Sequence, residues 1–140
     1  ENDKLFAPDP AKSKKELTFY YAAPGSFLIT GSPTNEPEGG PGYRISDETA
    51  DNKKTNAKGT LCMLLEMDPV SKNPIPNTGG SQFMITLQDM PAWNGIYTPF
   101  GRITEGLEVA EKLAQGDAIE TVTVVSKRNH PYQATKLPVR

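Results

Sequence analysis

Cysteine and histidine, which form disulfides, bind metals and take part in many catalytic sites, are almost absent from this sequence. Its 140 residues include one cysteine and one histidine. A single cysteine excludes an intramolecular disulfide and any metal site built from several cysteines. Because Cys62 lies in the apolar run LCMLL, we predict a buried and unreactive thiol. The histidine, His130, lies in a polar segment near the end of the sequence, which gives little support to a hydrolase.

Long apolar runs and a dominant charge are missing as well. No apolar stretch approaches the roughly 18 residues that a membrane-spanning helix needs. The net charge is -2 at pH 7, with acidic and basic residues interspersed, so no basic stripe indicates a nucleic-acid surface. We therefore predict no membrane span and no nucleic-acid partner. The compartment stays open between a soluble cytoplasmic protein and one exported after removal of its signal.

Proline and glycine, in contrast, are abundant. The chain has 13 prolines and 12 glycines, which favours many short elements joined by turns over a helical bundle. The strand at 60–65 is a continuous apolar run, which predicts cover on both faces. Runs of aromatic, apolar and β-branched residues predict strands at 17–21, from 27 onward, 60–65, 82–87, 97–103 and 119–124.

One clear helix is predicted, at 105–115. Thr104 is placed to cap its start, and Gly116 follows its end. The remaining segments are loops, among them the proline-rich stretches 32–42 and 67–80, and loops of such length are commonly functional or mobile. One side of the helix is apolar, which predicts a buried face made of Leu107, Val109, Ala110, Leu113 and Ala114.

The pattern indicates one domain. A chain of 140 residues can bury about two thirds of its unfolded surface. Residues 1–16 are polar and interrupted by prolines, so we predict an arm or loop there. A single domain follows at 17–126, and residues 127–140 form an extended polar tail.

Four stretches of the sequence resemble one family in their order along the chain. KGTLCM, NTGGSQFMIT, NGIYTPFGRITEGLEVAEKL and IETVTVV are similar to segments of the cyclophilins, which are peptidyl-prolyl cis-trans isomerases. The likeness runs from about residue 19 to residue 126. It implies a mainly β fold, a closed antiparallel β-barrel capped by helices, with a substrate groove over one face.

The resemblance also implies a missing part. The family's first two strands and most of its first helix have no counterpart before Phe19. We therefore expect either an open barrel, or a barrel completed by another chain or by a portion absent from this sequence. The unpaired strand edges of an open barrel favour a partner that covers them.

The groove residues that the resemblance implies begin with Gln82. It matches the glutamine of the family's SQF motif, which hydrogen-bonds the peptide backbone; the alternative is an amide that ties down the adjacent loop. Met84 lies on the same face of the strand and matches a phenylalanine at the floor of the proline pocket. Trp93 matches a leucine that lines this pocket, and Tyr97 a histidine or tyrosine on its rim. Core packing is the alternative for Met84 and Trp93, while Phe83 points the other way, into the core.

The family's catalytic arginine has no counterpart here. Its motif Phe-His-Arg is matched by Phe19-Tyr20-Tyr21, so Tyr21 takes the place of the arginine. A tyrosine can donate one neutral hydrogen bond but lacks the charged fork of a guanidinium. Gln82 and Tyr21 are therefore the candidate catalytic residues.

Two alignments stay open just after this motif. Without a gap, Ser26 matches the family's pocket phenylalanine and Ile29 its second glutamine. With Ser26 as an insertion, Phe27 becomes the pocket aromatic and Thr30 matches the glutamine. We assign Phe27 to the substrate pocket, together with Met84, Trp93 and Tyr97.

One wall of the groove also differs from the family. Leu65 stands in place of an asparagine, and the insertion at 67–76 carries three prolines. The backbone of this wall pairs with the substrate peptide in the family. The insertion is long enough to fold over the groove.

The expected function is isomerisation of X–Pro bonds in peptides or folding proteins, without a cofactor or a metal. Rotation of such a bond faces a barrier of about 18–20 kcal/mol because amide resonance is lost in the twisted state. A pocket for the proline ring and donors to its neighbours lower this barrier. Because Tyr21 replaces the arginine, we expect weak activity. The alternative is a catalytically inactive, cyclophilin-like peptide-binding or structural module of a larger assembly.

Overall fold

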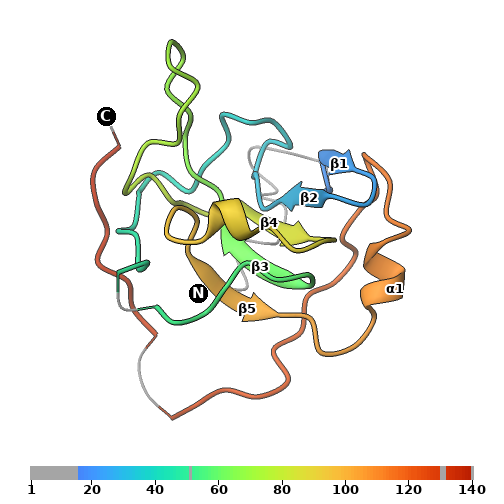
Figure 1. The fold of residues 1–140 in the computed structure, drawn as a ribbon. Helices are drawn as coiled ribbons and strands as arrows, with labels where there is room; N and C mark the ends of the chain where they lie inside the picture. Colours follow the sequence, from blue (N-terminus) through green and yellow to red (C-terminus); the bar gives the residue numbers. More distant parts are fainter. Residues whose placement is uncertain (1–15, 51, 130–131, 140) are drawn as a thin grey trace.

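An antiparallel sheet of five short strands forms the centre of the computed structural model, which describes residues 16–50, 52–129 and 132–139 (Figure 1). The strands lie in the order β1-β2-β4-β3-β5, so the strand that begins within the SQFMIT motif is central. Two short helices follow β4 and β5: the 3-10 helix η2 (Pro91–Trp93) and α1 (Leu107–Ala110). The strands are β1 (Tyr21–Ala23), β2 (Phe27–Thr30), β3 (Thr60–Met63), β4 (Phe83–Thr86) and β5 (Pro99–Arg102).

Residues from three neighbouring strands meet on one face of the sheet. Ile29 lies opposite Met84, and Met84 lies opposite Cys62. Because successive side chains of a strand alternate between faces, these three share a face, where they join an apolar cluster with Leu65 and Tyr97. The thiol of Cys62 is fully buried, and burial raises its pKa to about 12. The predicted buried thiol is therefore confirmed.

A second apolar cluster covers the opposite face of the sheet. Phe83 packs against it, as predicted, and makes an edge-to-face contact with Phe100 at a centroid distance of 5.8 Å. The side chains of β4 therefore alternate between two cores, with Phe83 in one and Met84 in the other. The buried members of this second cluster are Leu28, Ile85, Leu87 and Ala110 of α1.

The prediction of a helix at 105–115 is wrong in its length, because α1 spans only Leu107–Ala110. The helix begins late since Gly106 has a φ of 86°, a left-handed conformation that an α-helix does not contain. Thr104 therefore does not cap it. From Lys112 onward the backbone hydrogen bonds join residues three apart, which is the tighter winding of a 3-10 turn.

The buried face predicted for this helix is also only partly correct. Ala110 is buried, and Leu107 and Leu113 are half-buried. Val109 is 60% exposed and Ala114 is exposed. A helix of one turn cannot keep five residues on one face, so the later residues leave the core.

The predicted strands at 17–21 and 119–124 are wrong in extent for a shared reason. Thr18 forms an isolated antiparallel bridge with Ala118, and the backbone hydrogen bonds around it join only residues 17–19 to residues 116–119. Within the described residues no neighbouring strand continues this pairing, and Val122 is 51% exposed. A β-branched segment favours an extended backbone, but a strand needs hydrogen bonds from a neighbour.

The mainly β fold is confirmed, and β2 to β5 fall within predicted strand segments. In the part of the chain that the structure describes, the outer strands β1 and β5 do not pair with each other, so the sheet is open. None of the helices in the described ranges has the length and apolar character of a membrane span. Most of the predicted arm, residues 1–15, and His130 lie outside the described residues.

Candidate functional site

A cleft of about 860 Å³ opens on the face of the sheet that carries Met84. Its walls come from parts of the chain that are distant in sequence. They are Tyr20, Tyr21, Phe27 and Ile29 in and beside β1 and β2, the loop 37–44, two segments beside β3 and β4 (64–67 and 78–82), and Val139. The loop 37–44 folds back beside the sheet and turns an apolar face into a bounded cleft.

The aromatic residues predicted for the substrate pocket form a continuous row. The ring centroids of Tyr21 and Phe27 are 5.5 Å apart, those of Phe27 and Trp93 5.2 Å, and those of Trp93 and Tyr97 5.1 Å. Such contacts contribute about 0.5–1.5 kcal/mol each beyond the burial of area. The row begins in the cleft wall with Tyr21 and Phe27 and ends in the core with Tyr97.

Met84, Trp93 and Tyr97 lie behind the cleft wall. Met84 is 2% exposed and Tyr97 8% exposed, and the described residues that line the cleft include none of the three. The hydroxyl of Tyr97 donates to the sulfur of Met67 at 4.0 Å, and burial, followed by nearby Cys62, raises the pKa of Tyr97. These three side chains support the wall from below.

Gln82 lies in the cleft wall just before β4, and every polar group of its amide has a partner. Its Nε2 donates to the carbonyl oxygens of Pro37 at 2.9 Å and Gly39 at 2.6 Å. Its Oε1 accepts from the hydroxyl of Tyr20. The side chain is 7% exposed. In this geometry the amide holds the loop 37–44, which is the alternative role that the sequence left open.

Close backbone contact at Gly31 fixes the beginning of the segment that leads from β2 to this loop. Ser81 Oγ donates to the carbonyl oxygen of Gly31 at 2.6 Å. Gly31 has a φ of +91°, and a Cβ on it would lie 2.3 Å from the carbonyl oxygen of Ser81. Only glycine satisfies both conditions. This approach of β2 to the start of β4 brings the loop within reach of Gln82.

Tyr20 is a site residue that sequence reasoning missed. It lines the cleft and its hydroxyl donates to Gln82. Burial, with a smaller contribution from nearby Glu38, raises the pKa of Tyr20 to about 12. The hydroxyl therefore stays a donor over the physiological range. The available signal was its match to the histidine of the Phe-His-Arg motif.

A second missed feature is an ion pair in the cleft wall. Arg44 is the one basic side chain among the described residues that line the cleft. Its Nε and Nη2 donate to both carboxylate oxygens of Glu66 at 2.6–3.0 Å. A bidentate pair of this kind fixes both side chains and balances their charge. Because 22 positions separate Arg44 from Glu66 in the sequence, no local pattern predicts the pair.

Tyr21 is an exposed polar residue in the cleft wall. Its side chain is 42% exposed, and its hydroxyl has no hydrogen-bond partner within the described residues. The contact of its ring with Phe27 fixes where the hydroxyl lies. Tyr21 thus presents one neutral, available donor to the cleft.

The proline-rich insertion borders the cleft and does not cover it. Met67 pairs with Pro74 at the base of a narrow hairpin, which projects away from the sheet at the top of Figure 1. At its tip the carboxylate of Asp68 accepts from the N–H groups of Ser71 and Val70, which lowers its pKa. Of the hairpin, only the base with Met67 reaches the cleft.

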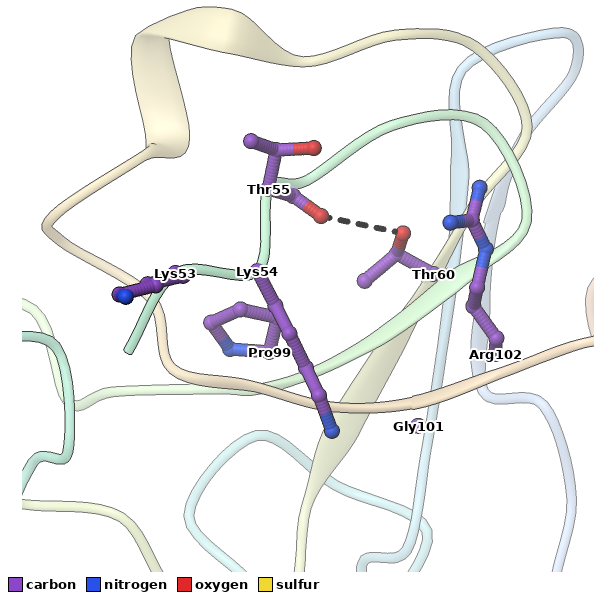
Figure 2. A pocket seen from close by; sticks show the side chains of 7 residues that line it. All are labelled: Lys53, Lys54, Thr55, Thr60, Pro99, Gly101 and Arg102. Carbon is purple, nitrogen blue, oxygen red and sulfur yellow. Dashed lines mark hydrogen bonds between the residues drawn. The ribbon is translucent and has the colours of Figure 1, made fainter. Parts of the chain in front are cut away.

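A smaller cavity of about 340 Å³ lies beside β5 and shares no lining residue with the cleft. Figure 2 shows Lys54 extended past Pro99 towards Gly101, with Arg102 on the other side. Within this cavity lining, the hydroxyl of Thr60 donates to the backbone carbonyl of Thr55 at 3.4 Å (Figure 2). Within the described ranges, no three histidine, cysteine, aspartate or glutamate side chains gather as metal ligands.

Comparison with known proteins decides the family. The family model for cyclophilin type peptidyl-prolyl cis-trans isomerase/CLD matches residues 11–135. This chain belongs to the cyclophilin family. Peptidyl-prolyl cis-trans isomerase B of Bacillus subtilis is 39% identical over 108 residues, which are 77% of this chain and 70% of that protein. A peptidyl-prolyl cis-trans isomerase of Helicobacter pylori is 38% identical over 112 residues, 79% of this chain and 64% of that protein.

Solved cyclophilin structures share the fold. A Cryptosporidium parvum cyclophilin type peptidyl-prolyl cis-trans isomerase, crystallised in the presence of the dipeptide Ala-Pro, matches with a TM-score of 0.59 and 28% identity. The match covers 89% of this chain and 72% of that chain. The expected cyclophilin-like, mainly β fold is thereby confirmed.

The cleft also bears on the two alignments after the Phe-His-Arg position. Phe27 and Ile29 line the cleft, whereas the hydroxyl of Ser26 accepts from Gln88 at 3.3 Å. Thr30 is fully buried and its hydroxyl donates to a backbone carbonyl at 2.8 Å. The position of Phe27 fits the alignment in which Ser26 is an insertion, whereas the positions of Ile29 and Thr30 fit the alignment without a gap. A second groove glutamine is replaced in either alignment.

Proposed function

We propose that this cyclophilin binds proline-containing peptides or unfolded segments in its cleft and isomerises their X–Pro bonds slowly. The observation that carries the proposal is the state of Tyr21. Its ring stands in the cleft wall beside Phe27, and its hydroxyl is available as a donor. The cleft therefore keeps a hydrogen-bond donor at the arginine position but no free positive charge.

The rate follows from how the twisted bond is stabilised. Apolar surface from Phe27, Ile29 and Leu64 offers contact to a proline ring. Binding alone does not accelerate rotation; the twisted state must be held more strongly than the planar one. A neutral hydroxyl stabilises developing charge less than a guanidinium does. By analogy with oxyanion-hole deletions, the lost donor lowers the rate by ~10²–10³.

In this proposal Gln82 is a positioning residue. Its amide N–H groups are directed at the carbonyls of Pro37 and Gly39, not at open cleft. It contributes to peptide contact by holding the loop 37–44 in place. Met84, Trp93 and Tyr97 contribute in the same indirect way, through the wall that carries Phe27.

A protease-coupled isomerisation assay on a short Ala-Pro peptide tests the proposal. Tyr21→Arg is expected to raise the rate by at least tenfold, and Tyr21→Phe to lower it, because the first adds a charged donor and the second removes the donor. Val109→Arg is the matched control, since it adds the same charge at an exposed helix position outside the cleft. Equal rates for Tyr21→Arg and the control would refute the role given to this position.

A peptide-binding or structural module is the second candidate. The engaged amide of Gln82 favours it, as do the open sheet edges β1 and β5 and the exposed side chains of Val122, Val124 and Val125. Another chain that completes the sheet would cover such edges. Peptide binding by calorimetry without any isomerisation would favour this candidate. If the chain neither binds nor isomerises the peptide, the structural role is the one that remains.

A further inference from the structure

A segment of the same chain already borders the cleft. Residues 136–139 run antiparallel to residues 43–45, and Figure 1 shows the last part of the tail beside this segment. The N–H of Arg44 donates to the carbonyl of Leu137 at 2.9 Å, and the N–H of Leu137 donates to the carbonyl of Arg44 at 2.7 Å. This reciprocal pair is the bonding unit of two neighbouring antiparallel strands.

Side chains on both sides of this bridge add contacts. The ammonium of Lys136 lies 4.7 Å from the ring centroid of Tyr43, within range of a cation–π attraction. Val139, two residues after the bridge, is itself one of the residues that line the cleft. Pro138 stands between them, and a residue before proline is restricted to extended conformations. Leu137 is thus held in the conformation that the bridge requires.

We propose that residues 136–139 are an intramolecular ligand of the cleft, which competes there with proline-containing peptides. The competition rests on the proposed peptide binding, whereas the docking itself rests on the contacts above. Peptides that enter pair with the backbone of Arg44 in an extended conformation, as the segment does. The carboxylate of Glu38, an exposed residue in the cleft wall, favours positively charged ligands, whereas Glu66 is already paired with Arg44.

The size of the effect follows from the fraction of molecules in which the segment has left the cleft. The apparent affinity of a competing peptide is its intrinsic affinity multiplied by that fraction. Two backbone hydrogen bonds and one exposed cation–π contact, partly offset by the ordering of four residues, hold the segment moderately. Undocking is therefore expected to tighten peptide binding about 5–10-fold.

Leu137→Pro removes the N–H that donates to Arg44 and undocks the segment. Ala134→Pro is the matched control, because it introduces the same residue into the same tail at an exposed position. A labelled Ala-Pro tetrapeptide is titrated into the wild-type chain and both variants. We expect binding about 5–10-fold tighter to Leu137→Pro alone. Equal affinity in all three chains overturns the competition while leaving peptide binding in place.

A second arm separates the docking from the peptide function. The synthetic peptide YQATKLPV, residues 132–139, is added to the Leu137→Pro variant, and the amide NMR signals of Tyr43 and Arg44 are followed. Shifts at these amides support the docking even if the Ala-Pro peptide binds no chain, in which case the proposed function fails and the docking stands. No shift at these amides overturns the inference.

Discussion

Replacing Gln82 with alanine measures how far its amide holds the cleft together. The side chain makes three hydrogen bonds, to the carbonyls of Pro37 and Gly39 and from the hydroxyl of Tyr20. A typical hydrogen bond contributes about 0.5–1.5 kcal/mol net, so losing all three lowers the free energy of unfolding by about 1.5–4.5 kcal/mol.

Solvent access places the expected value near the lower end of that range. Pro37 is exposed and Gly39 half-buried, so water can take over part of the bonding to their carbonyls. Tyr20 is half-buried, and its hydroxyl loses its acceptor. We expect a loss of about 2 kcal/mol, together with loosening of the loop 37–44.

Urea unfolding followed by the fluorescence of Trp93, with linear extrapolation to water, gives this value. Gln88→Ala is the matched control: it removes the same side chain at the other end of β4, where it is exposed and makes one hydrogen bond, at 3.3 Å to Ser26. A change below about 0.5 kcal/mol is expected there. If Gln82→Ala is no more destabilising than this control, the amide does not hold the loop and is free to contact a peptide.

Other positions give sharp outcomes in the same unfolding assay. Gly31→Ala is expected to destabilise by at least ~2 kcal/mol more than Gly25→Ala, since both have positive φ but only the former meets a backbone oxygen. Leu113→Ala is expected to lower stability by about 1–2 kcal/mol because the side chain is only half-buried; a loss under about 0.5 kcal/mol would place it outside the core. Burial raises the pKa of Cys62 from 9.0 to about 12, so the stability that its neutral thiol contributes is present below pH 9 and lost as pH rises towards 12. Cys62→Ala should therefore lose less stability over this pH range than the wild type, and an unchanged pH profile would contradict the reasoning.

Local sequence patterns predicted the strands correctly wherever the fold supplied a neighbouring strand to pair with. The run at 60–65 became β3 with both faces covered, and Phe83 and Met84 point into different cores, because alternation is a property of any extended chain. The SQF motif, in turn, located the cleft wall. These predictions depend on a few consecutive residues, so no distant contact was needed to make them.

Prediction failed where one element depended on another. The helix at 105–115 begins late because Gly106 adopts a left-handed conformation, which the sequence permits but does not require, and it ends early in a 3-10 turn. The strand at 119–124 did not form because, in the described residues, pairing ends near Ala118. Strand propensity describes how a residue fits a sheet and cannot supply the partner strand.

The sequence by itself determined the family and the mainly β fold, because the motifs that indicate both consist of adjacent residues. The tertiary structure alone decided which partners the cleft residues contact. Gln82 contacts Pro37 across 45 positions and Arg44 pairs with Glu66 across 22, so the amide and the cation are committed to partners no motif specifies. Hydrogen bonds depend on distance and direction in space, and only the folded chain sets these.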